Sequence, residues 1–504
     1  MGSYIGIDLG TTYSAVAHID ETGRPVIIGN PSPKDGNNIT PSNVTVIDNK
    51  FIVGQRARRN FQLSDFSLGR FKRAMGTSKV FELNGKDITP TELSTIVLKE
   101  MLRIATEDIG EVEKAVVTIP ANFGNEAREA TLQAAKDAGL DVEYIIDEPT
   151  AAALCYAFES GEKLDGNYVI YDLGGGTFDV SIISVSGQDI DVLASNGLQE
   201  LGGDDFDKEI QSLVRAKSKE ATGTDLDDSE YTLIQAEEDK ISLSNRRKCI
   251  AGGGEDIGGE PITITRDEFE KSISSLLAQT EMMCETTLTD AKLELEDIQE
   301  IILVGGSTRM PVVRESVKRV FDKAPILPAN VDEMVALGAA LYAAFKSDKK
   351  GLNSSQKQSI KSITISDVAS HYFGTLSIAY NKNLGIQEHV NSIIIRKGDK
   401  IPCSVTEEFF TIVDGQVTVQ CEITQSMSLE TDKKFVRIIW EGQLELPPDR
   451  PAGQKINVTY SYDDNSIMHC VFEDVATGAT CSKTLDNNSK DADESDIDEK
   501  FLVD

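Results

Sequence analysis

The fold of this chain is decided by the stretch Tyr171-Asp172-Leu173-Gly174-Gly175-Gly176-Thr177-Phe178-Asp179. A shorter copy near the start reads Ile7-Asp8-Leu9-Gly10-Thr11-Thr12-Tyr13-Ser14. Each stretch follows an apolar run of the kind that forms strands and leads into another such run. We therefore predict two hairpins, each with a carboxylate at its entrance.

The composition of these turns suits a polyphosphate. Glycine lets the backbone approach an anion and point its N–H groups at it, and threonine hydroxyls add uncharged donors. Asp8 and Asp172 cannot bind phosphate directly, so a cation must lie between, and hydrated Mg²⁺ takes such oxygen ligands. A single Asp-Leu-Gly turn is weak evidence, because it is more often an ordinary connection between strands. Its recurrence, followed each time by threonine, favours the phosphate site.

The overall composition limits the class of protein. The length of 504 residues suggests two or more domains. A formal charge of −33 opposes general binding to nucleic acids or acidic membranes, because their phosphates would be repelled. The seven cysteines form no Cys-x-x-Cys pair and the four histidines lack metal-ligand spacing, which indicates a reducing, cytoplasmic compartment. With no leader and no run of about 18 apolar residues, neither secretion nor a membrane span is expected.

Local signals predict alternating helices and strands in the first two thirds of the chain. Thr89-Pro90-Thr91-Glu92 supplies an N-cap, a first-turn proline and a capping-box glutamate. Asn125 is expected to cap the next helix. A strand over residues 142–146 then delivers Asp147 and Glu148 to the sheet edge at which ligands bind in open α/β folds. The alternative for both carboxylates is that they cap the helix that follows.

Two further glycine turns come later. Leu201-Gly202-Gly203-Asp204-Asp205-Phe206-Asp207 opens a helix whose N-terminal dipole would face an anion. Gly305-Gly306-Ser307-Thr308-Arg309-Met310-Pro311 follows a predicted strand. Between them, one helix carries Glu237, Lys240 and Ser244 on a single face. Taken alone, a polar triad of this kind is more often a solvated face than a ligand contact.

The composition changes beyond residue 346. A polar, lysine-rich segment up to residue 361 indicates a linker. An all-β module follows, with strands predicted at 363–365, 372–380, 391–394, 409–413, 417–423, 435–446, 456–462 and 467–473. Residues 487–504 are acidic and are expected to be disordered.

Two common nucleotide-binding motifs are excluded. The only Gly-Lys pair, Gly85-Lys86, is followed by Asp87, so the P-loop pattern does not occur. The pattern Gly-x-Gly-x-x-Gly is also absent. A P-loop enzyme and a standard dinucleotide-binding fold are therefore disfavoured.

Five motifs together carry a family resemblance. They are the two hairpin stretches, Ile146-Asp147-Glu148-Pro149-Thr150-Ala151-Ala152-Ala153, and the glycine turns at 201–207 and 305–311. In order and spacing they resemble the ATPase domain of DnaK-type heat-shock chaperones over about residues 4–346. The resemblance implies an α/β, actin-like fold of two lobes with ATP in the cleft, and it explains the internal copy as two related halves.

The resemblance also implies roles for individual residues. Lys72 would orient the attacking water and stabilise the γ-phosphate, and Glu148 would position or deprotonate that water. Asp8 and Asp172 would hold hydrated Mg²⁺, and Thr177 joins them in the catalytic set. The expected phosphate-lining residues are Gly10, Thr11, Thr12, Tyr13, Gly174, Gly175, Gly176, Gly202 and Gly203. Those expected to form the rest of the ATP pocket, mainly around adenosine, are Glu237, Lys240, Ser244, Gly305, Gly306, Arg309 and Asp332.

The C-terminal module resembles the β-sandwich peptide-binding domain of the same family. Phe410 and Val417 are expected near its apolar groove, and core packing is an equally open alternative for each. The implied ligands are unfolded or extended polypeptides. Pro120 and Arg128 match family residues that relay the nucleotide state between the two domains.

Three departures from the family pattern alter these expectations. The family's helical lid is missing, so bound peptide is expected to exchange fast. The segment Ile363-Thr364-Ile365-Ser366 offers less apolar surface than the family's interdomain linker. Tyr144 replaces an arginine that contacts J-domain partners, and Asp147 replaces a common asparagine, which weakens the expected stimulation by a J-domain.

The sequence thus predicts a chaperone that binds ATP and Mg²⁺, hydrolyses ATP slowly and binds polypeptide. Its predicted parts are an ATPase domain (1–346), a linker (347–366), a β-sandwich domain (367–486) and an acidic tail (487–504). A J-domain co-chaperone and a nucleotide-exchange factor are the other expected partners. One alternative is a regulatory scaffold that holds ATP with little turnover. Another is a sugar kinase on the same fold, which would leave the β module unexplained.

Overall fold

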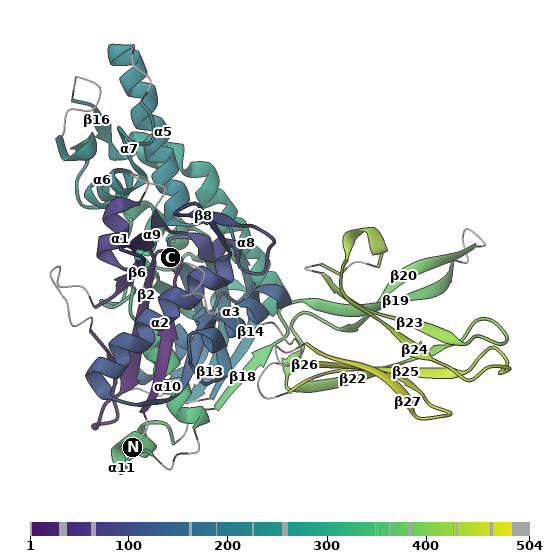
Figure 1. Cartoon of the computed structure of the whole chain (residues 1–504). Coiled ribbons are helices and arrows are strands. Elements are labelled where there is room, and N and C mark those ends of the chain that lie inside the picture. Colours follow the sequence, from purple (N-terminus) through teal and green to yellow (C-terminus); the bar gives the residue numbers. More distant parts are fainter. Residues whose placement is uncertain are drawn as a thin grey trace. The chain divides into compact units, whose positions relative to one another are not determined.

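The structure, a computed structural model, describes residues 3–29, 38–61, 67–160, 164–187, 189–223, 226–254, 261–347, 349, 351–361, 364–381, 386–426, 428–429, 431–463 and 467–485. The predicted tail at 487–504 lies outside these residues. The chain divides into two compact units, one within Met1–Thr364 and one within Ile365–Asp491 (Figure 1). Each unit has its own hydrophobic core.

One sheet organises the first lobe of the first unit. Its strands are β1 (Ser3–Asp8), β2 (Tyr13–Ile19), β3 (Pro25–Ile27), β10 (Val112–Ile119) and β11 (Val142–Asp147), in the order β11-β10-β1-β2-β3. The central strand β1 pairs antiparallel with β2 and parallel with β10. Ile5 and Ile7 are fully buried on this strand. The strand ends at Asp8, which lies at the carboxyl edge of the sheet.

The sheet of the second lobe repeats this arrangement. Its strands are β12 (Leu164–Leu173), β13 (Phe178–Gly187), β14 (Asp189–Leu198) and β17 (Ile298–Val304). Here β12 pairs antiparallel with β13 and parallel with β17, as β1 does with β2 and β10. The two quoted stretches therefore form the predicted hairpins, with Asp8 and Asp172 near equivalent strand ends.

Two helices pack on the first lobe, and at two of their contacts the backbones approach so closely that only glycine fits. They are α4 (Glu148–Ser160) and the alanine-rich α10 (Met334–Lys346). A Cβ atom at Gly338 of α10 would collide with the carbonyl oxygen of Ala151 in α4, and one at Gly6 would collide with the backbone of Ala340. The position of Glu148, the first residue of α4, is thus fixed by backbone packing.

Two further helices of this lobe can be compared with the N-terminal ends that the sequence predicted for them. The capping box of Thr89 and Glu92 opens α2 (Pro90–Ile109), as predicted. The helix α3 (Asn125–Asp137) begins one residue earlier than predicted, with Gly124 at the N-cap. The assignment of Asn125 as the cap was therefore wrong. Its side chain instead donates to Glu129, one turn along the helix.

The remaining elements of the first unit surround these two sheets. In the first lobe they are β4 (Thr40–Pro41), β5 (Val44–Ile47), β6 (Lys50–Val53), α1 (Gln55–Asn60), β7 (Ser67–Leu68), η1 (Phe71–Ala74), β8 (Phe81–Leu83) and β9 (Lys86–Ile88). In the second they are α5 (Gly203–Thr222), α6 (Leu233–Asn245), β15 (Lys248–Ile250), η2 (Ala251–Gly254), β16 (Thr263–Thr265), α7 (Arg266–Ser272), α8 (Ser274–Ala291), η3 (Leu295–Asp297), η4 (Gly306–Arg309) and α9 (Pro311–Phe321).

Part of the segment predicted as a linker is helical. This helix, α11 (Ser354–Ser359), is capped by Asn353 and belongs to the first unit. The side chain of Asn353 donates to the carbonyl of Glu21, and that of Gln356 donates to the carbonyl of Ile19. The last helix of the first unit is therefore attached to the hairpin of β2 and β3.

The second unit is a β-sandwich of two four-stranded sheets. One sheet has the order β20-β19-β23-β24 and the other β22-β25-β26-β27. The strands are β19 (Tyr372–Asn381), β20 (Ile386–Ile395), β22 (Cys403–Phe410), β23 (Thr418–Ser426), β24 (Arg437–Glu445), β25 (Lys455–Tyr462), β26 (Met468–Asp474) and β27 (Ala479–Leu485), with short β18 (Thr364–Val368), β21 (Lys400–Ile401) and η5 (Lys433–Phe435). Ile423 of one sheet and Tyr460 and Phe472 of the other lie in the shared core.

One strand prediction in this unit was wrong, and one strand was missed. The strand predicted at 409–413 is β22, which begins at Cys403 and ends at Phe410. The polar edge strand β27 was not predicted at all.

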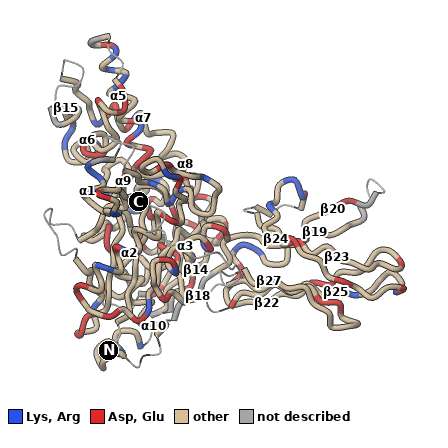
Figure 2. Tube along the Cα trace, in the orientation of Figure 1, with Lys and Arg blue, Asp and Glu red and all other residues tan. Residues whose placement is uncertain are grey.

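Among the helices of the described chain, none has the combined length and apolar character needed to cross a bilayer. All seven cysteines are free thiols. Acidic residues, which outnumber basic ones by 83 to 50, occur along both units (Figure 2).

Candidate functional site

The two predicted hairpins meet at their glycine turns. A Cβ atom at Gly175 would collide with Thr12, and one at Gly176 would collide with Thr11. Only glycine lets the two turns approach this closely. The Thr12 hydroxyl is buried there and has no hydrogen-bond partner in the structure. The turns thus form a cradle lined by backbone, and the Thr12 hydroxyl inside it is available to bind a ligand.

Four ionisable side chains surround the base of this cradle. Burial, followed by the charge of Glu148, raises the pKa of Asp8 to about 7. Burial and the same carboxylate raise the pKa of Asp172 well above its ordinary value. The ammonium group of Lys72 opposes both shifts. Two carboxylates that hold their protons for this reason are stabilised as anions by a nearby cation.

Lys72 and Glu148 form the closest pair of the site. The Nζ of Lys72 donates to Oε1 of Glu148 at 2.6 Å, and both side chains are buried. Lys72 lies on η1, and its Nζ stands 5.7 Å from the centre of the Phe123 ring. Sequence reasoning placed Lys72, Glu148, Asp8 and Asp172 in one site, and the structure brings them together.

The second glycine turn, residues 201–203, packs against the β12–β13 hairpin. The backbone N–H of Gly203 donates to the carbonyl of Gly174 at 2.9 Å, and that of Asp204 donates to Gly175 at 2.8 Å. The N–H of Gly174 in turn donates to the carbonyl of Thr177, a buried residue, at 3.1 Å. These hydrogen bonds hold the hairpin turn against the start of α5.

The third glycine turn joins the same assembly. The Ser307 hydroxyl donates to the carbonyl of Gly174 at 2.9 Å. Gly305 has a φ of 82°, and a Cβ atom there would stand 2.5 Å from the carbonyl oxygen of Leu173. A Cβ atom at Gly306 would lie 2.9 Å from a carboxylate oxygen of Asp332. Glycine is therefore required at Gly305, where the close atom is backbone, whereas the Asp332 side chain could move away from a Cβ atom at Gly306.

The residues expected around adenosine lie on α6 and near η4. Lys240 pairs with Asp207 at 2.8 Å and donates to the carbonyl of Gly203 at 2.9 Å, which ties α6 to the turn at residues 201–203. Glu237 pairs with Arg58 at 2.6 Å. Other contacts of this set are Ser244 to the carbonyl of Lys240 at 3.0 Å, Arg309 to Asp332 at 2.6 Å, and the Arg58 guanidinium 5.3 Å from the centre of the Tyr13 ring.

Comparison with known proteins decides the family. A model of the Hsp70 protein family matches residues 4–82 and 78–502. The chain belongs to the Hsp70 family.

Similar relatives come from the mycoplasmas. The chaperone protein DnaK of Mycoplasmopsis agalactiae is 36% identical over 512 residues, which cover 98% of this chain and 80% of the relative. The DnaK of Mycoplasmopsis synoviae is 35% identical over 513 residues, which cover 99% and 81%. This chain is therefore a DnaK-like, ATP-binding member of the heat-shock chaperone family. The sugar-kinase alternative does not fit a family match that continues through the β module.

Sequence reasoning missed three residues of this candidate site. Asp179 is buried, and its Oδ1 has no hydrogen-bond partner in the structure. Burial, then the charges of Glu148 and Asp172, raise its pKa well above the ordinary value. Asp172 and Asp179 are opposite each other in the hairpin register, a signal that was available from the sequence. Arg58 and Arg70 had no local signal, because their partners come from α5 and α6.

The positions linked to domain communication are also defined. Arg128 pairs with Asp147 at 2.9 Å, so the carboxylate that replaces the family's asparagine has a cationic partner. The Nζ of Lys346 lies 5.0 Å from the centre of the Tyr144 ring. Pro120 is buried directly after β10. A lysine thus stands beside the tyrosine that replaces the family's arginine.

The β-sandwich has an open hollow of about 630 Å³. Its apolar lining comes mainly from Val390, Ile393, Phe409 and Leu429. Phe410 and Val417 are about half exposed and are not among the lining residues, so neither is part of the core. Ile412 and Val413 are similarly exposed, which makes residues 410–417 an unusually apolar connection between β22 and β23.

Proposed function

We propose that this protein is an ATP-dependent chaperone that hydrolyses ATP slowly with Mg²⁺ and binds unfolded or extended polypeptide. The observation that carries the proposal is the buried Lys72–Glu148 ion pair at the base of the glycine cradle. We take the two lobes as the actin-like halves that the sequence predicted, with the nucleotide between them.

The residues present fit Mg-ATP. Asp8 and Asp172 are buried carboxyl groups with raised pKa values. Once ionised they would repel each other, and a bound divalent cation would relieve that repulsion. No three His, Cys, Asp or Glu side chains of the described chain come close enough to hold a metal directly. As the family resemblance implies, Asp8 and Asp172 would hold Mg²⁺ through its water molecules. Bound there, the ion would neutralise charge on the phosphate oxygens.

The chemistry of hydrolysis then follows from Lys72 and Glu148. An ammonium group has three donors, of which Glu148 uses one, so Lys72 can also hold a water and a γ-phosphate oxygen. Glu148 accepts a proton of that water and orients it for in-line attack. In phosphoryl transfer, positioning the water matters more than removing its proton with a strong base. A site that relies on such positioning is consistent with the slow turnover proposed here. The backbone of the turns at Gly174–Gly176 and Gly202–Gly203 would line the phosphates.

Adenosine is assigned to Glu237, Lys240, Ser244, Arg309 and Asp332. Lys240 supports the assignment because it already contacts the turn that holds Gly203. The tyrosine Tyr13, under the Arg58 guanidinium, stands at the first hairpin and would contact the same nucleotide.

The test is single-turnover hydrolysis by the full chain and by Lys72→Ala. We expect the substitution to lower the rate constant by at least about 100-fold, since it removes the group that orients water and stabilises charge. The matched control is Lys50→Ala, an exposed lysine of the same lobe, which should hydrolyse ATP at the parent rate. Equal, background-level rates for parent and Lys72→Ala would reject the enzymatic proposal.

The second candidate is a scaffold that binds ATP with little turnover. It is favoured by the Arg128–Asp147 pair and by Tyr144, which change positions tied to J-domain stimulation in the family. A parent that binds ATP with background hydrolysis, in the presence and absence of an unfolded peptide, would support this candidate. J-domain co-chaperones and nucleotide-exchange factors remain proposed partners of either form.

Peptide binding is assigned to the β-sandwich, near the hollow beside Phe409 and the exposed connection that holds Phe410 and Val417. Fast exchange is part of the same proposal. The dissociation of a labelled apolar peptide from the full chain should be complete within seconds in nucleotide-free buffer. A half-time of many minutes would contradict fast exchange, and undetectable binding would leave the sandwich a scaffold.

A further inference from the structure

Arg70 has an uncommon backbone conformation next to the catalytic lysine. It directly precedes η1, which carries Lys72, and its φ of 62° lies in the left-handed region that residues other than glycine seldom adopt. Such a conformation persists where surrounding contacts hold it.

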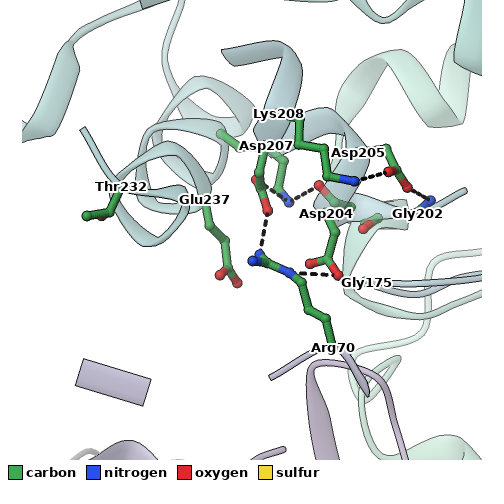
Figure 3. A network of polar contacts seen from close by, with 12 residues as sticks. Arg70, Gly175, Gly202, Asp204, Asp205, Asp207, Lys208, Thr232 and Glu237 are labelled. Carbon is green, nitrogen blue, oxygen red and sulfur yellow. Dashed lines mark hydrogen bonds and ion pairs between the residues drawn. The ribbon is translucent and has the colours of Figure 1, made fainter. Parts of the chain in front are cut away.

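The contacts of Arg70 reach the opposite lobe. Its Nε lies 2.9 Å from Oδ2 of Asp204, and one terminal nitrogen lies 3.8 Å from Oδ2 of Asp207. Figure 3 shows the Arg70 side chain extending from its own segment toward both carboxylates on the first turns of α5. The Phe61 ring, with its centre 5.1 Å from the guanidinium carbon, covers the other side.

The two carboxylates are deeply buried. Their side chains are 2% and 1% exposed, whereas that of Arg70 is 17% exposed. The helix dipole favours acidic groups in the first turn of α5, but it does not neutralise two of them. Lys240 pairs with Asp207, and within the described part of the chain Arg70 is the cation that lies within ion-pair distance of Asp204. Without Arg70, a buried carboxylate would lose its charge partner, which strongly disfavours the closed arrangement.

The same turn of α5 faces the nucleotide cradle. Arg73, three residues after Arg70, pairs with Asp205 at 2.7 Å and donates to the carbonyl of Gly175 at 3.3 Å. The N–H of Gly202 donates to Asp205. Two arginines of the first lobe therefore hold the start of α5, and Arg70 takes the more buried pair. Because the proposed nucleotide lies between hairpins of both lobes, separating the lobes must precede its release.

We propose that Arg70, with Asp204 and Asp207, is a latch between the two lobes that sets how long a nucleotide stays bound. Arg70 is a positioning residue here, because it acts by holding η1 against α5 and not by touching the reacting atoms. The inference rests on the proposed nucleotide site.

The test is the release of a fluorescent ADP analogue, loaded with Mg²⁺ onto the full chain and displaced by excess ATP. Arg70→Ala should release it at least about tenfold faster than the parent. Arg70→Lys, which keeps the charge but loses the planar fork, should give an intermediate rate. Asp204→Asn should also speed release, and Arg70→Ala/Asp204→Asn should be no faster than the faster single variant. Arg56→Ala, an exposed arginine on α1, is the matched control and should release at the parent rate.

A purely structural role would give a different pattern. Hydrolysis of pre-bound ATP by Arg70→Ala, measured in a single turnover, should change less than the release rate does. Circular dichroism confirms folding, and Arg70→Lys provides the decisive comparison if the alanine variant does not fold. Release rates within twofold of the parent for both Arg70→Lys and Asp204→Asn would overturn the latch. A parent that binds no nucleotide would instead reject the proposed function, and the latch with it.

Discussion

Lys72 and Glu148 stand 76 positions apart in the sequence and share a 2.6 Å contact in the structure. Asp8 and Asp172 could be predicted because each ends a strand before a glycine turn, so the local pattern determines where the carboxylate lies. Arg70 could not be predicted, since the carboxylates it contacts, on α5, become its neighbours only in the folded chain. Residue-level prediction therefore succeeds where one turn defines the site and fails where two distant segments do.

Asp207 makes stability depend on pH. Burial, partly opposed by Lys240, raises its pKa from 3.8 to about 7. The unfolded chain loses this proton near pH 4 while the folded chain keeps it to about pH 7, so Asp207 lowers the free energy of unfolding across that window. Asn cannot titrate. We therefore expect the unfolding free energy of Asp207→Asn, minus that of the parent, to rise by about 1–3 kcal/mol from pH 5 to pH 7 and then level off.

This prediction is checked by urea unfolding of the nucleotide-free chain at pH 5, 6, 7 and 8, followed by circular dichroism. Glu220→Gln, an exposed carboxylate near the other end of α5, is the control for a general effect of charge. A difference between Asp207→Asn and parent that is flat across this range would contradict the assignment.

At the scale of elements, the strongest sequence signals were those with a local mechanism. The capping box placed the start of α2, and the paired glycine motifs placed both hairpins. The strand predicted at 409–413 was wrong beyond Phe410 because Ile412 and Val413 are exposed rather than packed, and apolar composition alone does not separate these cases. The strand β27 was missed because it is a polar edge strand.

The contact of α10 with α4 gives a prediction for Gly338. Alanine is favoured over glycine in a helix by about 1 kcal/mol. Here the added Cβ would meet the backbone of Ala151, which cannot move aside as a side chain would. The clash should prevail, and Gly338→Ala should destabilise the first unit by about 3 kcal/mol.

Thermal unfolding followed by circular dichroism measures this effect. The control is Gly29→Ala, whose Cβ would meet only the Asn38 side chain at an ordinary 3.5 Å, so its stability should match that of the parent within about 0.5 kcal/mol. A stable Gly338→Ala variant would mean that the two helices are packed less tightly than described.

At the scale of the whole molecule, the two units can be followed separately. The α-helices of the described chain all precede residue 360, and the single tryptophan, Trp440, packs against Phe472 in the sandwich. Helical circular dichroism therefore reports on the first unit and tryptophan fluorescence on the second. The sequence predicted both kinds of structure from the change in composition near residue 346.

Mg-ATP should stabilise only the unit that binds it. At a concentration 100 times the dissociation constant, a ligand adds about 2.7 kcal/mol to the free energy of unfolding. We expect the helical transition to shift to higher urea while the Trp440 transition stays in place, because each unit has its own core. Mg²⁺ without ATP is the control. Equal shifts of both signals would show that the units unfold together.

The attachment of α11 gives the first unit a mechanical property. Tension that reaches residue 361 along the chain is carried by α11, and the bonds from Asn353 and Gln356 pass part of it to the carbonyls of Glu21 and Ile19. Ile19 ends β2, and Tyr13 begins it, next to the threonines of the first turn. A force on the chain after α11 is therefore transmitted to the C-terminal end of β2, the strand whose N-terminal end lies at the nucleotide cradle.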